Sequence, residues 1–151
     1  WRFRRWRDPL VDVVGCHEHE YGWLVERAGC DITPGFKAIK AVDATGRIHG
    51  MIGYGAWTEN SCLMHIALDN PACFRSLLAW AFRYLFEMTG RGVAFATVRA
   101  RNERSMRLCK RIGMREAYRL KDAIAVGEDM VLFEMRREDC RWIPEAVRKA
   151  A

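Results

Sequence analysis

Three arginines recur on one side of a short predicted helix in the carboxyl-terminal third of the chain. The segment begins at Asn102, whose side chain is suited to capping a helix, and ends at Gly113, which is suited to stopping one. Within it, Arg104, Arg107 and Arg111 follow the i, i+3 and i+7 spacing of one helical side. Such a row can bind phosphate groups, and it is also typical of an ordinary solvated helix face.

The overall charge is compatible with an anionic ligand but does not select one. The 151 residues carry a formal net charge of +6 at pH 7, with the arginines spread along the chain. A moderately basic surface suits coenzyme phosphates or nucleic acid, and it also simply keeps a protein soluble. Half of the residues are apolar, so a chain of this length can bury one core, and we expect a single domain over residues 1–151.

Cysteines and histidines are too scattered to indicate a metal centre or a disulfide framework. The six cysteines include no Cys-x-x-Cys pair, which favours a reducing, cytoplasmic location. The run from Cys16 to His19 offers two imidazoles, but positions i and i+2 of a helix project in different directions. We expect no metal site. We also expect no signal peptide and no membrane span, because no apolar run reaches about 18 residues.

Strands and helices alternate along the chain, which indicates a mixed α and β domain. Strands are predicted over residues 2–6, 36–42, 48–57, 62–68, 92–100, 116–120 and 129–135, and helices over parts of 10–28 and over 72–89, 102–113 and 143–151. Asp8-Pro9 begins the first helical region, which we expect to break near Gly15 and Gly22. Gly46 is expected to supply the positive φ of a hairpin turn.

The longest predicted helix, residues 72–89, has an apolar face and aromatic flanks. The residues expected to face a sheet are Phe74, Leu77, Leu78, Ala81, Leu85 and Met88. Trp80 and Phe86 lie on the flanks of this face. Exposed aromatic side chains there would form a surface for a protein partner or for self-association.

The order of these elements resembles that of the Gcn5-related N-acetyltransferase (GNAT) family over nearly the whole chain. The helix that begins at Asn102 is similar to the family pattern Asn-x-x-(Ala/Ser)-x-x-Leu-Tyr-x-x-x-Gly-Phe, because it keeps Ser105, Leu108 and Gly113. Cys109 stands where the family usually has tyrosine, and Met114 replaces the phenylalanine. The last strand, within residues 127–137, looks like that of ribosomal-protein-acetylating and phage or prophage members.

The resemblance implies an α+β fold with three layers. We expect a mostly antiparallel, twisted sheet of about six to seven strands, flanked by helices, with a splayed parallel pair in its centre. The splayed pair would be the strands over residues 62–68 and 92–100.

The resemblance also implies acetyl-CoA as co-substrate, lying between the splayed strands. Its pantetheine arm would bond to the first strand, and its pyrophosphate to N–H groups at the start of the next helix. The candidate contacts are Ile66, Leu68, Cys73, Phe74, Arg75, Ser76, Leu77, Asn102, Ser105 and Arg107. The family's glycines are absent between Pro71 and Leu78, so bulky Phe74 and Leu77 would weaken binding while Arg75 would supply charge.

Three residues are candidates for proton transfer. Cys109 could act as the acid in place of the family's tyrosine, or it is a small buried residue, which is the more common role of an unpaired cysteine. His65 and Glu59 could act as the base, directly or through water. A histidine within a strand is more often structural, and the pair Glu59-Asn60 is also a natural turn.

Three functions follow from these features. The first is an N-acetyltransferase that acts on a primary amine of a small molecule or a protein, with an acceptor cleft between the loops at residues 31–35 and 123–128. The second is an inactive GNAT-fold structural protein, such as a phage virion component. The third is nucleic-acid binding through the arm at residues 1–7, which a first strand explains equally well, so we do not expect nucleic acid as a partner.

Overall fold

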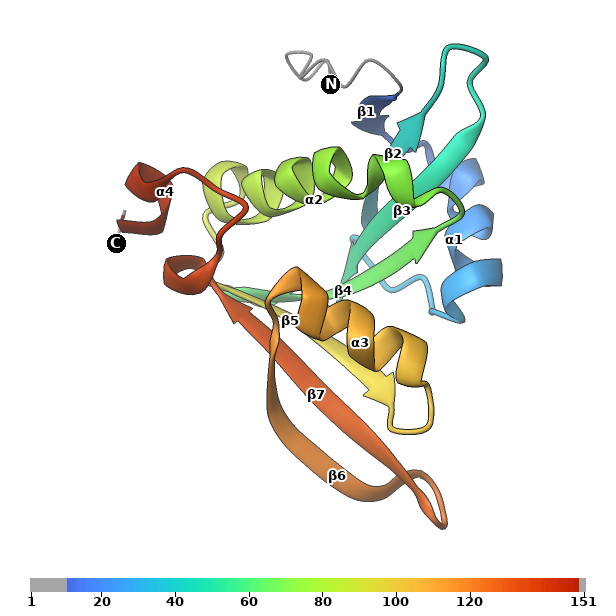
Figure 1. The fold of residues 1–151 in the computed structure, drawn as a ribbon, viewed down its shortest axis with the longest axis vertical. Coiled ribbons are helices and arrows are strands. Elements are labelled where there is room, and N and C mark those ends of the chain that lie inside the picture. Colours follow the sequence, from blue (N-terminus) through green and yellow to red (C-terminus); the bar gives the residue numbers. More distant parts are fainter. Residues whose placement is uncertain (1–10, 150–151) are drawn as a thin grey trace.

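The computed structural model describes residues 11–149, and it contains one twisted sheet of seven strands (Figure 1). The spatial order is β1-β2-β3-β4-β5-β7-β6. The strands are β1 (Asp12–Gly15), β2 (Lys37–Val42), β3 (Ile48–Gly55), β4 (Ser61–Leu68), β5 (Val93–Arg99), β6 (Arg115–Ala125) and β7 (Glu128–Arg136). Neighbours are antiparallel except β4 and β5, which run parallel in the centre of the sheet. This is the sheet that the resemblance implied.

Helices lie on both faces of this sheet. They are α1 (Tyr21–Ala28), α2 (Phe74–Phe82), α3 (Glu103–Ile112) and α4 (Glu145–Lys149), with short 3₁₀ turns η1 (Glu18–Glu20), η2 (Pro71–Cys73) and η4 (Arg137–Asp139), and a π-helix η3 (Arg83–Met88). No helix within residues 11–149 is long and apolar enough to cross a membrane.

The sheet carries one hydrophobic core on each of its two faces. α2 packs on β1, β2 and β3, and α3 packs on β5, so that both cover the same face (Figure 1). α1 packs on β3 and β4 from the opposite face. Because successive side chains of a strand point to opposite faces, Ile52 belongs to the larger core and its neighbour Met51 to the smaller one.

The locally encoded turns and caps are confirmed. Gly46 has a φ of 84° in the β2–β3 hairpin. The Asn102 side chain accepts a hydrogen bond from the Ser105 N–H at 3.0 Å, and Gly113 ends α3 with a φ of 103°. A small polar cap and a left-handed glycine define helix ends without help from distant residues.

The prediction for the amino-terminal region is wrong in two respects. Residues 12–15 form strand β1 rather than part of a helix, and the helix α1 begins only at Tyr21 and contains Gly22 without a break. β1 pairs with β2 over its whole length, and a β-branched pair such as Val13-Val14 suits a strand. The strand predicted over residues 2–6 lies outside the described residues.

The end of the long helix departs from its predicted face, because it widens into the π-helix η3. The Thr89 N–H bonds to the Tyr84 carbonyl, five residues back, at 3.0 Å. A π-turn holds more residues than an α-turn, so the side chains that follow rotate relative to the sheet. Phe86 is consequently 2% exposed and Met88 47% exposed, the reverse of the prediction. The partner surface predicted from Trp80 and Phe86 is therefore wrong for Phe86, and Trp80 is half-buried against the larger core.

We expect Gly53→Ala to destabilise the fold by about 2 kcal/mol or more, as overpacking of a tight core does. A Cβ at Gly53 would lie 2.3 Å from the Cζ atom of Phe36 and 2.6 Å from a methyl group of Leu24. Both neighbours are buried, so neither can move away freely. Urea unfolding measures the effect, and Gly22→Ala, at an exposed position of α1, is the control, because no atom lies within 4 Å of its added methyl. Equal stability of the two variants would contradict this packing.

Candidate functional site

β4 and β5 begin side by side and then separate (Figure 1). They are paired only from Ser61 with Val93 to Leu63 with Phe95. β4 continues to Leu68 and β5 to Arg99, and each keeps its antiparallel partner on its outer side. Beyond Leu63 and Phe95 the two inner strand edges are no longer paired with each other, and we call this region of unpaired strand edges the β4–β5 slot.

The direction of the main-chain groups along the slot follows from the bonds at the strand ends. The Asn60 carbonyl accepts bonds from the N–H groups of Gly92 and Val93, whereas the Asp69 N–H donates to His49 on the β3 side. Because these directions alternate along a strand, the main-chain groups of Met64, Ile66 and Leu68 face the slot. By the same alternation, Thr97 and Arg99 of β5 face it from the other side, since the carbonyl of Gly92 and the N–H of Ala100 bond toward β7.

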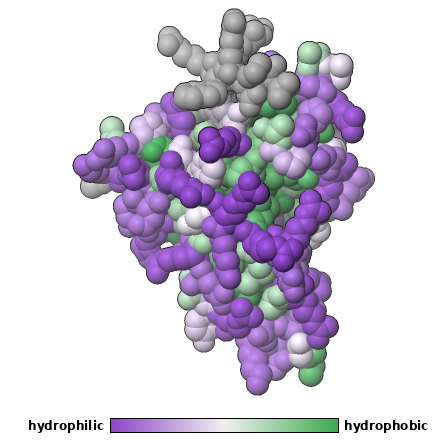
Figure 2. Space-filling model, in the orientation of Figure 1, coloured by the Kyte–Doolittle hydropathy of each residue, from purple (hydrophilic) through white to green (hydrophobic). Residues whose placement is uncertain are grey.

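The slot has an apolar wall on the face covered by α2 and α3. The side chains of Ile66 and Leu68 are half-buried and pack against the larger core, as does Met106 of α3. In Figure 2, hydrophobic atoms are exposed near the middle of this face and are bordered by hydrophilic side chains. A thin, apolar ligand with a few amide groups would fit such a slot, because amides can bond to the strand edge as another strand does.

The first turn before α2 uses several of its own N–H groups. The Asn70 side chain accepts from the Ala72 N–H at 2.9 Å. The N–H groups of Cys73 and Phe74 donate to the carbonyls of Asn70 and Pro71. The free donors predicted at Cys73 and Phe74 are thus engaged within the turn. The exposed Arg75 is the charged side chain next to this helix start, which has no acidic residue in its first turn.

Side chains at the start of α2 divide between the core and the α3 side. Cys73, Ser76 and Leu77 are buried. Phe74 packs edge-on against Trp142, with ring centroids 5.9 Å apart, and the Arg111 guanidinium lies 5.5 Å from its ring. Phe74 therefore joins α2 to the end of α3 rather than entering the sheet.

On α3, the predicted row of arginines is exposed. Arg107 pairs with Glu103 one turn earlier at 3.1 Å, and Arg104 and Arg111 also face solvent. Asn102 caps the helix through its side chain, and Ser105 is half-buried beside it. Cations placed beside the slot can attract an anion, although exposed pairs are individually weak.

Cys109 lies in the larger core, with 6% of its surface exposed. Burial raises the pKa of its thiol to about 11. A thiol with this pKa is a poor acid at neutral pH, so the position of Cys109 matches that of a small buried residue.

Of the two candidate bases, His65 lies in the middle of β4 and Glu59 lies in the turn before it. The His65 side chain is half-buried on the α1 face, with its ring centroid 6.2 Å from that of Phe36. Burial lowers the pKa of His65, and the nearby carboxylate of Asp31 partly offsets this. Glu59 is exposed in the turn before β4, beyond the paired end of the slot. His65 therefore lies on β4 beyond its last pair with β5, with its side chain on the α1 face, whereas Glu59 lies before the first pair.

Reasoning from side-chain types missed residues that the structure places at the slot. Met64 and Thr97 were not singled out, because their main-chain groups rather than their side chains face the slot. Asp31 was noted only as part of a loop, yet its carboxylate acts on His65. The period of two in both strands was the signal that could have identified Met64 and Thr97.

Histidines 17 and 19 form no metal site with their neighbours. Their rings stack with centroids 5.7 Å apart. Within residues 11–149, no group of three or more His, Cys, Asp or Glu side chains is arranged to hold a metal ion.

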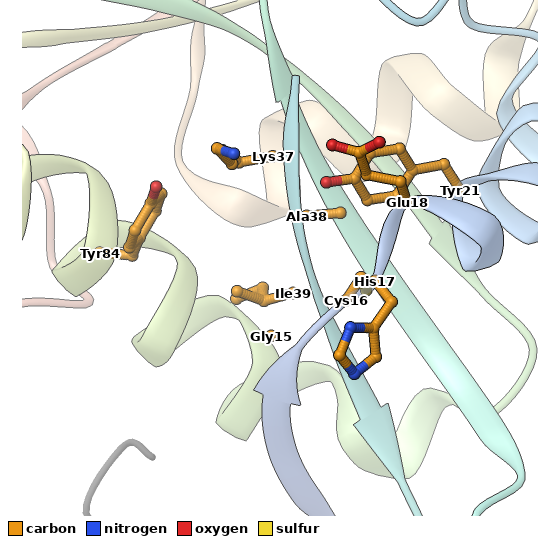
Figure 3. A pocket seen from close by; sticks show the side chains of 9 residues that line it. All are labelled: Gly15, Cys16, His17, Glu18, Tyr21, Lys37, Ala38, Ile39 and Tyr84. Atoms are coloured by element: carbon orange, nitrogen blue, oxygen red, sulfur yellow. The ribbon is translucent and has the colours of Figure 1, made fainter. Parts of the chain in front are cut away.

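A cavity of about 360 Å³ opens at the other edge of the sheet (Figure 3). It is lined by Gly15, Cys16, His17, Glu18, Tyr21, Lys37, Ala38, Ile39 and Tyr84. Tyr84 stands on one side, and Glu18 and Tyr21 on the other (Figure 3). β3 separates these β1 and β2 residues from β4, so the cavity is distinct from the β4–β5 slot.

We expect the pH dependence of folding to report the burial of His65. Because the pKa of His65 is lower in the folded chain than in the unfolded chain, the unfolded chain binds the proton first as the pH falls. The contribution of His65 to stability is complete above about pH 6.5 and decreases below it.

His65→Gln should therefore flatten the decrease in unfolding free energy between about pH 7 and pH 5. Urea titrations at several pH values measure this slope. The matched control is His19→Gln, which removes an imidazole from an exposed position. An unaltered slope in His65→Gln would show that this imidazole titrates alike in both states.

Sequence comparison gives no assignment. No protein family model matches the chain. No curated protein matches it either.

Structure comparison does find relatives of the fold. The chain is similar to the spermidine/spermine N-acetyltransferase SpeG from Vibrio cholerae in complex with manganese ions, with a TM-score of 0.69 and 11% identity over 85% of this chain and 93% of that one. A second SpeG structure, in complex with CoA and spermine, gives a TM-score of 0.70 and 10% identity over 87% and 98% of the two chains. At this level of identity the likeness concerns the fold. The chain therefore has the GNAT fold, a mixed seven-stranded sheet with a parallel β4–β5 pair flanked by helices.

Proposed function

We propose that this protein is an N-acetyltransferase that transfers an acetyl group from acetyl-CoA to a primary amine. The observation that carries the proposal is the early end of the β4–β5 pairing, which leaves main-chain groups unpaired along a narrow apolar slot. A solved protein of the same fold binds CoA together with spermine, a polyamine, which supports both the donor and the amine.

Different residues of this chain would bind different parts of acetyl-CoA, the acetyl donor. The main-chain groups of Met64, Ile66 and Leu68 would bond to the pantetheine amides, and acetyl-CoA supplies the activated thioester. Arg75, at the start of α2, and Arg104, at the start of α3, would face the phosphates. In the family, a glycine-rich turn before this helix would bind the phosphates through its N–H groups. In this chain, N–H groups of the corresponding turn donate to Asn70 and Pro71 instead, so these two charges would take over part of that role.

The acceptor amine would approach from the α1 face, because the face of α2 and α3 would be occupied by the phosphates. His65 lies on that α1 face, and its lowered pKa keeps its imidazole neutral at pH 7 and able to take a proton from an ammonium group. The amine nitrogen then attacks the thioester carbon, forming the C–N bond as the C–S bond breaks, and it gives up its second proton to water. The sulfur leaves as thiolate and receives a proton from water, since buried Cys109 is poorly placed to give one.

The first test is binding of acetyl-CoA. A ligand at 100 times its dissociation constant should stabilise the folded chain by roughly 2.7 kcal/mol. Arg75→Glu should weaken that binding by about tenfold, because a carboxylate would meet the phosphates at the helix start. Calorimetry gives the affinity, and Lys121→Glu is the control, since it reverses one exposed charge on β6, away from α2.

Turnover is measured separately, by release of free thiol from acetyl-CoA in the presence of a simple alkylamine. Absence of a thermal shift at millimolar acetyl-CoA would exclude the proposed function. Equal affinity in the Arg75→Glu and Lys121→Glu variants would show that the phosphates lie elsewhere.

A further inference from the structure

The carboxyl-terminal half of the sheet has a second, open face. On β5 and β7, side chains such as Ala94, Ala96 and Phe133 point into the larger core. Their alternate neighbours point to the α1 side, where α1 packs on β3 and β4. Among the described residues, neither core includes Leu63, Phe95 or Leu132, although all three are half-buried.

Strand register arranges this open face in rows that begin at the slot. In the first row, Leu63 of β4 stands beside Phe95 of β5, which stands beside Glu134 of β7. In the next row, Leu132 stands beside Thr97, at the point where β4 has already moved away. The apolar floor is thus continuous with the closed end of the slot, where Leu63 and Phe95 are paired.

The accessible charges on this face are cationic. Glu134 and Glu128 are 16% and 14% exposed, and each is covered by a guanidinium. Arg99 and Arg115, which cover them, are both 63% exposed. A ligand lying on the floor would therefore meet guanidinium groups rather than carboxylates at its distal end.

A negative charge lies on the opposite side, next to His65. The Asp31 carboxylate is close enough to act on the His65 imidazole. An ammonium group held there would be beside the candidate base. Along β5, Thr97 and Arg99 are two residues apart, which corresponds to a rise of roughly 7 Å along the strand.

We infer that the acceptor is a small primary amine with an apolar carbon body and an anionic distal group. This inference rests on the proposed function and names the substrate class of the same site. The amine lies between Asp31 and His65, the carbon body on Phe95 and Leu132, and the anionic group at Arg99. A polycation would bring like charges to the exposed guanidinium groups and is disfavoured.

Three probes of equal carbon length test this inference: aminocaproate, hexylamine and hexamethylenediamine. They differ only at the distal end, which is anionic, neutral or cationic. We expect kcat/KM to decrease in that order, with about a tenfold difference between aminocaproate and hexamethylenediamine. The anionic probe gains one attraction to an exposed guanidinium and the cationic probe meets one repulsion, and together these account for a difference of this size. The assay is thiol release from acetyl-CoA at low ionic strength. Added salt should reduce the difference in kcat/KM between the three amines, because it screens exposed charges.

A variant links the preference to one side chain. Arg99→Gln should raise the KM for aminocaproate by about fivefold relative to the KM for hexylamine, which carries no anionic group. Glutamine removes the charge without placing a second carboxylate beside Glu128. Arg47→Gln, an exposed arginine in the β2–β3 turn, is the matched control and should change neither amine.

The outcomes separate the two proposals. Failure to bind acetyl-CoA would remove the proposed function and this inference together. Transfer to hexylamine with equal or better transfer to hexamethylenediamine would overturn this inference alone. Binding of acetyl-CoA without transfer to any of the three amines would also overturn it, as would a dimer in solution in which the face is covered by a second copy.

Discussion

Hydrogen bonds at Asn60 and Gly92 hold together the closed end from which β4 and β5 diverge. The Gly92 N–H lies 3.0 Å from the Asn60 carbonyl and 2.9 Å from its side-chain oxygen, and the Val93 N–H reaches the same carbonyl at 3.1 Å. A Cβ at Gly92 would lie 2.8 Å from that side-chain oxygen, so only glycine leaves room for the arrangement. These bonds fix the relative position of the two strands at this end. The strands can therefore diverge after three paired positions while the closed end of the slot stays in place.

Each side of the slot has its own support. α2 stabilises β1, β2 and β3, and α3 stabilises β5, so neither half of the sheet needs ladder bonds across the slot to remain ordered. The halves are joined again above the sheet. The Trp142 indole N–H donates to the Ile112 carbonyl at the end of α3, at 2.7 Å, and its ring meets Phe74 at the start of α2. A site made of unpaired backbone is therefore held between two separately packed layers.

Elements whose signals are local were predictable from the sequence, and elements that depend on distant partners were not. The cap at Asn102 and the stop at Gly113 act within a few residues, which is why α3 was placed correctly. β1 was missed because four residues become a strand only when β2 lies beside them. The slot was expected only from the resemblance to the GNAT family, since main-chain groups leave no trace in residue types. His65 was a candidate from its position, but its neighbour Asp31 comes from a loop that no spacing rule connects to it.

The π-helix at the end of α2 has a consequence for how this fold tolerates changes in length. Its wide turn accommodates an additional residue inside the helix, close to where the chain turns at Gly90 toward β5. A one-residue deletion here could tighten the turn to an ordinary α-helix, whereas the same deletion in β5 would reverse the facing of every later side chain. The helical connection between β4 and β5 can thus change in length by one residue without shifting the register of the strands on either side.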